Sequence, residues 1–266
     1  MSSPTHHALL SASSAHRWLS APPLPRLEQY FPHTTSNAAA EGTAAHALGE
    51  YKIHRLLGDK FKRPTSDYQS DEMEDLTDDY ACYVLEQYQK AKEYAPDATI
   101  SVEQKLNFSN YVPEGFGTGD CVIISDHLLH IIDFKYGKGV RVEAKNNPQM
   151  KLYAIGALEM FGSLYDVDKV EVTIFQPRMS NISTWMINAK QLMHWATTEL
   201  KQKAELAFAG KGTIRYGPWC QFLIATKFTV AAMLEYRLTS MLLTPTVTVE
   251  SPVVLVTFKK FAMVSH

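Results

Sequence analysis

The sequence predicts an α/β protein in which helices flank a central mixed β-sheet and a helical region precedes that sheet. Two observations carry this prediction: apolar and polar residues alternate in five short segments, and helical apolar spacing appears before, between and after those segments. A helix between two groups of strands is typical of a sheet that is covered by helices.

The N-terminal region is expected to be helical. Residues 11–19 read as a short capped helix that runs into a proline-rich loop at 21–25. The alanine-rich stretch 38–57 contains strong helix formers, and Asn37 is a plausible N-cap. Residues 71–94 regain helical spacing, and the acidic residues in their first turns suit the positive end of a helix dipole.

Strands are expected from residue 99 onward, with one helix between them. The alternating segments are 100–108, 122–124, 128–134, 169–176 and 182–187. Ser125–His127 is the expected tight turn of the central hairpin. Pro148–Phe161 is expected to be an amphipathic helix, because Pro148 suits an early helical position and Gly162 lies just past the end.

The C-terminal part divides into a helix and a tail. A long helix is expected over 189–209, and a strand-like stretch over 244–256. We therefore treat residues 1–216 as one domain that includes the N-terminal helices, and 217–266 as an atypical C-terminal tail.

The bulk composition narrows the class of protein. With 266 residues, of which 45% are hydrophobic, the chain can bury a full core, and its formal net charge of −2 excludes a globally basic DNA-binding protein. The apolar runs fall short of the roughly 20 residues needed to cross a bilayer, so we expect a soluble, cytoplasmic protein, in the bacterial host if phage-encoded. The three cysteines are widely spaced and are expected to be buried hydrophobes: Cys82, Cys121 and Cys220.

Two aspartates and a lysine at the central hairpin form the clearest chemical pattern. Asp120 ends a Gly-Thr-Gly-Asp sequence at the start of one strand and Asp133 lies near the end of the next, so antiparallel pairing brings both to one end of the hairpin. Lys135 follows on the same strand face as Asp133, and the carbonyl of Phe134 is a further oxygen donor. Such oxygen donors bind Mg²⁺ or Mn²⁺, and a metal beside an ammonium group suits phosphodiester hydrolysis.

Two more residues could complete this site. His46 lies in the alanine-rich helix with Glu50 one turn later, and an imidazole can complete a metal shell, preferably that of Mn²⁺. Glu103 stands in the middle of a predicted strand. It is either a metal or water ligand with a catalytic role or the outward residue of an edge strand, and the sequence leaves both readings open.

Polar residues beyond the catalytic strand are candidates for contact with nucleic acid. Gln149 and Tyr153 stand four apart on one helix face, where the pair can hydrogen-bond a phosphate or stack on a base. The basic side chains that could grip a DNA strand are Lys138, Arg141, Lys145 and Lys151. A group of charges like this is also typical of an ordinary solvated surface, so its position alone does not show whether it contacts DNA.

With these motifs in place, residues 10–209 resemble the PD-(D/E)XK nuclease superfamily. The likeness is to the RecB-like exonuclease branch and to phage and prophage nucleases of the domain-of-unknown-function 2800 type. The motifs that carry it are Gly-Thr-x-x-His ending at His46, Gly-x-x-Asp ending at Asp120, Asp-Phe-Lys at 133–135 and Gln149-x-x-x-Tyr153.

The resemblance implies a restriction-endonuclease-like core and a role for each motif. His46, Asp120 and Asp133 would bind the metal and Lys135 would be catalytic. Gln149 and Tyr153 would support the site and engage DNA, while Glu103 matches a less regular acidic position. Many relatives also hold a four-cysteine iron–sulfur cluster, but this chain has Ala21 in the first cysteine region and only Cys220 in the second, so no cluster is expected.

The function expected from this resemblance is that of a Mg²⁺- or Mn²⁺-dependent deoxyribonuclease. We expect an exonuclease that processes linear DNA ends in phage or prophage recombination, with a phage single-strand annealing protein as a candidate partner. The sequence leaves homo-oligomerisation open. The alternative is a catalytically silent DNA-binding or assembly module that retains the nuclease fold.

Overall fold

A five-stranded mixed sheet forms the centre of the part of the chain described by the computed structural model, which covers residues 8–29, 36–213, 243–250 and 253–260. The strands lie in the order β1 (Thr99–Asn107), β2 (Phe116–Ser125), β3 (Leu128–Phe134), β4 (Lys169–Gln176) and β5 (Asn181–Asn188). Strands β3 and β4 run parallel, and the other neighbouring pairs run antiparallel. The predicted mixed sheet is therefore confirmed.

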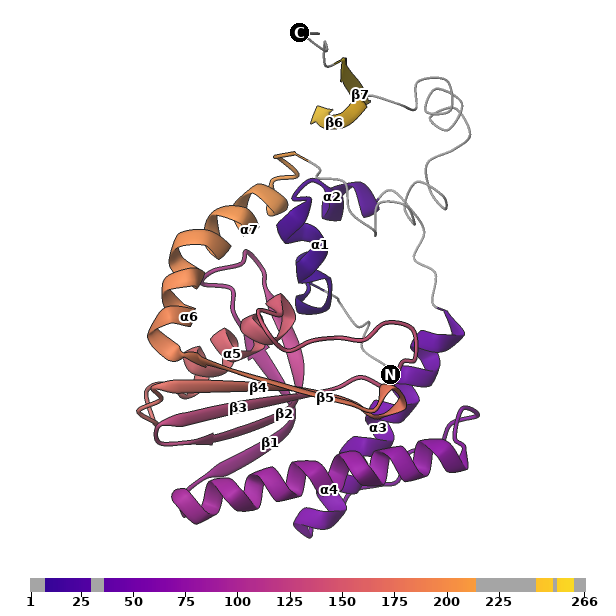
Figure 1. Ribbon diagram of the computed structural model, residues 1–266, viewed down its shortest axis with the longest axis vertical. Coiled ribbons are helices and arrows are strands. Elements are labelled where there is room, and N and C mark those ends of the chain that lie inside the picture. Colours follow the sequence, from indigo (N-terminus) through magenta and orange to yellow (C-terminus); the bar gives the residue numbers. More distant parts are fainter. Residues whose placement is uncertain (1–7, 30–35, 214–242, 251–252, 261–266) are drawn as a thin grey trace, which may run out of the picture.

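Helices cover both faces of this sheet, as Figure 1 shows. The helical elements are η1 (Ala12–Ser14), α1 (Ala15–Ser20), α2 (Leu24–Glu28), α3 (Asn37–Leu57), α4 (Asp71–Tyr94), α5 (Pro148–Phe161), η2 (Pro177–Met179), α6 (Ala189–Trp195), the π-helical turn η3 (Ala196–Leu200) and α7 (Lys201–Phe208). Helices α3 and α4 pack on one face, whereas α5 and the α6–α7 helix pack on the other. None of the described helices is long and apolar enough to span a membrane.

Alternation along the strands separates two apolar cores. Val122 and Ile131 point into the core beneath α5, which we call the α5-side core. Cys121 and Ile132, their immediate neighbours, point into the core beneath α3 and α4, the α4-side core. Side-chain direction in the two central strands therefore tells which helices a residue can reach.

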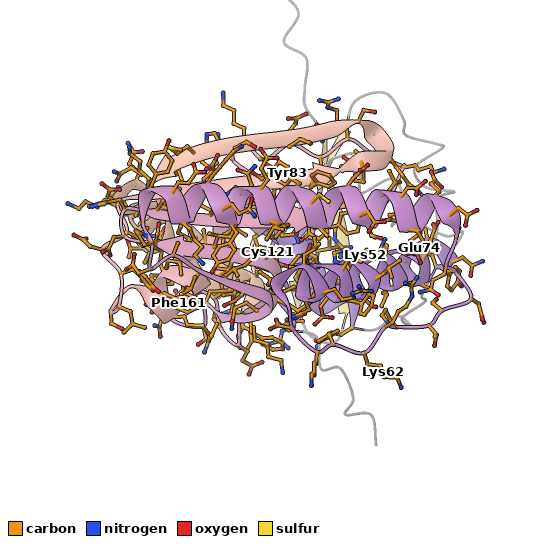
Figure 2. The ribbon with its side chains drawn as sticks, turned by 90° about the horizontal axis from the view of Figure 1, so that it is seen from below. Lys52, Lys62, Glu74, Tyr83, Cys121 and Phe161 are labelled. Carbon is orange, nitrogen blue, oxygen red and sulfur yellow. The ribbon has the colours of Figure 1, made fainter. Side chains whose placement is uncertain are left out.

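Helices α3 and α4 are joined to each other by a buried lysine. Lys52 of α3 and Glu74 of α4 lie between the two helices (Figure 2), with 3.1 Å from Lys52 Nζ to Glu74 Oε2. The same ammonium donates to the Glu74 carbonyl at 2.6 Å and lies 2.8 Å from Asp78 Oδ1. The contacts of Lys52 thus join α3 directly to α4.

Several local expectations need correction. Ser36, not Asn37, caps α3, because its hydroxyl accepts from the backbone N–H of Ala39 at 3.2 Å. The proline-rich segment expected to be a loop begins helix α2, where Pro25 sits within the first turn and its missing N–H costs nothing.

The cysteine prediction holds at one of the two described positions. Cys121 is buried, but Cys82 is exposed on α4, and Cys220 lies outside the described residues. In the tail, β6 (Leu243–Glu250) and β7 (Val253–Lys260) pair antiparallel, which agrees with the strand-like pattern expected there.

Candidate metal centre

Asp120 and Asp133 lie at one end of the β2–β3 pair. Cys121 is opposite Ile132 in the ladder, so the next position of the same register sets Asp120 opposite Asp133. Each lies two residues from an α5-side core residue, Val122 or Ile131, and therefore on the same face of the sheet. The hairpin therefore places both aspartates at the same end and on the same face of the sheet, and both are almost fully buried.

Asp120 is held by partners from two directions. Its Oδ2 accepts a hydrogen bond from the backbone N–H of Phe134 at 2.7 Å, across the hairpin. Its Oδ1 lies 3.3 Å from Nδ1 of His46, which reaches it from helix α3. The carboxylate therefore connects the end of β3 to the N-terminal helical region.

Three potential metal ligands converge on this point. One ligand atom each from His46, Glu103 and Asp120 lie within 4.8 Å of one another. The sequence allows Glu103 to be either an outward strand residue or a ligand, and in the structure a carboxylate oxygen of Glu103 belongs to the cluster. Asp133 is next to this group without belonging to it, since its oxygens engage Lys135 and Gln149 instead.

An unusual backbone conformation presents Glu103. Its φ is +48°, in the left-handed region that costs a residue with a Cβ roughly 1–2 kcal/mol. The β1–β2 ladder pairs Val102 with Cys121 and Gln104 with Gly119 but omits the position between them. Val102 and Leu106 are four residues apart and would face the same side of a regular strand. Because the ladder is interrupted at Glu103, Val102 instead packs against the α4-side core and Leu106 packs in the α5-side core. Strain of this kind is concentrated at functional sites.

Lys135 and Gln149 form the second half of the site. Lys135 Nζ lies 2.9 Å from Asp133 Oδ2 and donates to Gln149 Oε1 at 3.2 Å. Gln149 Nε2 in turn donates to Asp133 Oδ1 at 3.0 Å and contacts the Tyr153 hydroxyl at 3.2 Å. The glutamine and tyrosine proposed to share a helix face therefore do so, and they fix the lysine–aspartate pair.

The glycine of the Gly-x-x-Asp element has a steric role. A Cβ placed on Gly117 would lie 2.9 Å from Cε1 of Tyr153. Because the tyrosine ring needs that space, only glycine lets β2 pass beneath it. The motif thus reflects packing of α5 over the strand as well as the ligand Asp120.

A family model described as a protein of unknown function, DUF2800, matches residues 7–248. The chain belongs to the DUF2800 family. Among solved structures, the crystal structure of SSO0001 is a match with 14% identity that covers 82% of this chain and 96% of that one, at a TM-score of 0.28. A superposition that loose assigns no role to any residue of this DUF2800 protein.

Electrostatics in the DUF2800 site favour positive charge. Burial alone lowers the pKa of His46, but the three carboxylates around it outweigh burial and raise the pKa to about 9. Burial and the nearby Asp120 raise the pKa of Glu103 to about 7. Burial tends to raise the pKa of Asp120 too, yet His46 and Lys135 hold it below its ordinary value.

Burial and neighbouring charges also set the pKa values of the Asp133–Lys135 pair. Burial raises the pKa of Asp133 above its ordinary value, with Lys135 opposing and Asp120 adding to the rise. For Lys135, burial lowers the pKa, but the two aspartates outweigh it and the pKa is raised. The lysine is therefore an ammonium at neutral pH.

The structure separates the predicted DNA-gripping residues of this DUF2800 protein into two groups. Lys138, Arg141 and Lys145 are exposed in the segment after Lys135, with Lys138 Nζ 3.4 Å from Glu72 and Arg141 Nε 2.9 Å from Glu143. Lys151 is only 8% exposed, and its Nζ lies 3.4 Å from the centre of the Trp195 ring. It packs against α6, apart from the other three.

Two residues near the candidate metal centre are not among the site residues predicted from the sequence. Tyr80 of α4 stacks on Phe134, with ring centres 4.5 Å apart, and its buried hydroxyl has no hydrogen-bond partner in the described part of the chain. Arg178 follows β4. Since β3 and β4 are parallel, a residue just past β4 must lie at the same edge as Lys135, which is the signal that could have indicated it.

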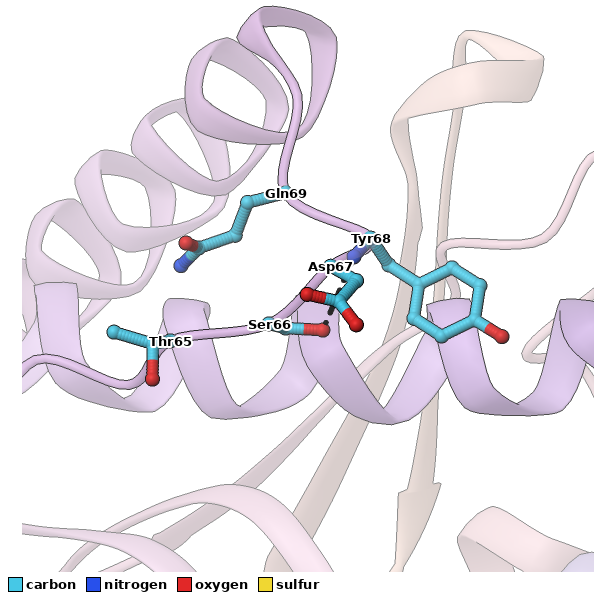
Figure 3. A pocket seen from close by; sticks show the side chains of 5 residues that line it. All are labelled: Thr65, Ser66, Asp67, Tyr68 and Gln69. Atoms are coloured by element: carbon cyan, nitrogen blue, oxygen red, sulfur yellow. Dashed lines mark hydrogen bonds between the residues drawn. The ribbon is translucent and has the colours of Figure 1, made fainter.

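One surface hollow of the DUF2800 chain lies elsewhere. It is lined by the five consecutive residues Thr65–Gln69, in the connection between α3 and α4 (Figure 3). These side chains include none of the candidate site residues.

Proposed function

We propose that this protein is a metal-dependent deoxyribonuclease that acts as an exonuclease on DNA ends. The observation that carries the proposal is the meeting, at one sheet edge, of a His46–Glu103–Asp120 cluster with an Asp133–Lys135 pair. The exonuclease mode, the phage recombination setting and an annealing-protein partner come from the family resemblance and are part of the same proposal.

The donor set fits Mg²⁺ or Mn²⁺. Carboxylate oxygens with one imidazole nitrogen are ligands that these ions accept, and Mn²⁺ tolerates the nitrogen better. The Oδ2 of Asp133 is buried and lies 2.9 Å from Nζ of Lys135, so the ammonium and a bound ion would share this oxygen. The residues that would hold the ion are therefore His46, Glu103, Asp120, Asp133 and the Phe134 carbonyl.

The chemistry divides between the ion and the side chains. When bound, a divalent ion neutralises the scissile phosphate and lowers the pKa of a water. Lys135 is placed to orient the attacking water and to offset charge that develops on phosphorus. Gln149 keeps the ammonium in that position by accepting its hydrogen bond while donating to Asp133.

The test compares end-labelled linear DNA with closed circular DNA in Mg²⁺ or Mn²⁺. We expect the wild type to degrade the linear substrate and spare the circle, and Lys135→Ala to lose roughly a hundredfold or more in rate. Cleavage of the circle would contradict the exonuclease mode. DNA binding without cleavage in either metal would favour the catalytically silent binding module instead.

A further inference from the structure

One arginine joins three elements at the edge of the sheet where the candidate metal centre lies. Arg178 is in the turn η2, two residues after β4 ends. Strand β4 pairs in parallel with β3, and the Phe175 carbonyl accepts from the backbone N–H of Lys135 at 2.8 Å. The backbone of Arg178 is therefore tied to the strand that carries Asp133 and Lys135.

The guanidinium reaches both helices of the opposite layer. Its Nη2 donates to Glu41 of α3 at 2.9 Å and to Glu72 in the first turn of α4 at 2.7 Å. The same nitrogen lies 2.7 Å from the hydroxyl of Tyr136, the residue after Lys135, and the guanidinium carbon lies 3.8 Å from the centre of that ring. Glu41 is on the helix that presents His46.

These partners, and not water, stabilise the charge of Arg178. Its side chain is only 7% exposed, so two carboxylates must compensate the buried charge. Its Nε is buried with no partner among the described residues. An unpartnered buried donor is unfavourable by about 1–3 kcal/mol, so the contacts of Nη2 hold the group in place despite that cost.

We propose that Arg178 is a positioning residue for the metal centre: it fixes helix α3 against the end of β3 so that His46 meets Asp120. This inference rests on the proposed function, because it assigns Arg178 a part in ion binding at that site. A purely stabilising role for Arg178 is the alternative, and the chain contains a control that separates the two.

Lys52 is the matched control. It is also a buried cation between two helices, and its polar contacts in the described part of the chain are with Glu74 and Asp78 of α4. Loss of Lys52 should lower stability while His46 keeps its place relative to Asp120. Loss of Arg178 should free α3 from the strand end even if the two helices stay paired.

The experiment measures Mn²⁺ affinity by titration calorimetry and thermal unfolding for Arg178→Met, Arg178→Lys and Lys52→Met. We expect Arg178→Met to weaken Mn²⁺ binding tenfold or more. Arg178→Lys should recover part of that affinity, because the lysine can keep one carboxylate contact. Lys52→Met should lower the unfolding temperature while its Mn²⁺ affinity stays within twofold of wild type. Should Arg178→Met fail to fold, Glu41→Ala, which removes the contact with α3 alone, takes its place with a smaller loss in the same direction.

The outcomes distinguish this inference from the function on which it rests. Unchanged Mn²⁺ affinity in the Arg178 and Glu41 variants, or an equal loss in Lys52→Met, overturns the positioning role while the nuclease proposal stands. A wild type that does not bind Mn²⁺, or whose binding survives Asp120→Asn, overturns both.

Discussion

The carboxylate of Asp120 accepts a hydrogen bond from the backbone N–H of Phe134 on the neighbouring strand, at 2.7 Å. In an extended strand the N–H and C=O of one residue point to the same side. The Phe134 carbonyl therefore faces the side on which Asp120 lies. The backbone oxygen expected as a metal ligand and the aspartate expected as its partner thus share one position at the end of the hairpin.

Replacing Asp120 with asparagine should separate ion binding from folding. Asn keeps an oxygen that can accept the Phe134 N–H, but it removes the charge that attracts a cation. We expect Mn²⁺ affinity to fall by roughly a hundredfold in a protein that still folds, at a somewhat lower unfolding temperature because His46 and Lys135 lose a buried counter-charge. Calorimetric titration and thermal unfolding of the same sample would show this, and retained affinity would contradict the ligand role of Asp120.

Glu103 should destabilise the folded protein at pH values above 7. Because its pKa is raised to about 7 in the folded state and is lower in the unfolded chain, its contribution to stability is lost as the pH rises through 7. Glu103→Gln should therefore raise the unfolding temperature at pH 8. Glu103→Gly should add about 1 kcal/mol more by relieving the positive φ, and both variants should lose Mn²⁺ affinity.

Glu114 provides the control for backbone strain. It is exposed and has a φ of +54°, outside the metal cluster. Glu114→Gly should stabilise the protein through the backbone alone and leave Mn²⁺ binding as in the wild type. A loss of stability in Glu103→Gly, with a gain in Glu114→Gly, would show that the side chain of Glu103 supports the fold and that the strain argument is wrong there.

Ion binding should release protons. Without metal, His46 with a pKa of about 9 is protonated at pH 7 and Glu103 with a pKa of about 7 is half protonated, whereas a metal ligand must be unprotonated. Mn²⁺ affinity should therefore rise with pH between about 6 and 8.5. Titration in two buffers of different ionisation enthalpy counts the protons released. A flat affinity over this range would contradict the ligand assignment, and His46→Gln should flatten the upper part of the rise.

Local chemistry allowed much of this fold to be predicted. Helix α5 and strands β3 and β4 have the bounds expected from alternation, from Pro148 and from Gly162. Counting residues across the tight turn sufficed to bring Asp120 and Asp133 to one end of the hairpin. These features depend on residues near one another in the sequence.

What could not be predicted depends on packing between distant elements. The positive φ of Glu103 has no sequence signal, because a glutamate in an alternating run reads as an outward strand residue. Lys151 lies among basic residues in the sequence, yet one turn of α5 carries it beneath Trp195. The link from Arg178 to Glu41 spans 137 residues and required the parallel pairing of β3 and β4 to be known.

The exposed and the buried basic residues should differ in their effect on the salt dependence of DNA binding. Each phosphate contact contributes about 0.7–0.9 to the slope of log affinity against log salt concentration. Lys138 and Arg141 are exposed, and their ion pairs with nearby carboxylates are of the weak surface type, so both can turn to a phosphate. Lys151 is already occupied by the Trp195 ring.

We expect Lys138→Ala and Arg141→Ala each to reduce that slope by nearly one, measured by fluorescence anisotropy of a labelled duplex without divalent metal. Lys151→Met should leave the slope unchanged and lower stability by about 1 kcal/mol, through the lost cation–π contact. If Lys151→Met lowered the slope as much as Lys138→Ala, α5 would have to present that lysine to DNA, which its contact with Trp195 argues against. Unchanged slopes in both Lys138→Ala and Arg141→Ala would remove the segment after Lys135 from the DNA-binding surface.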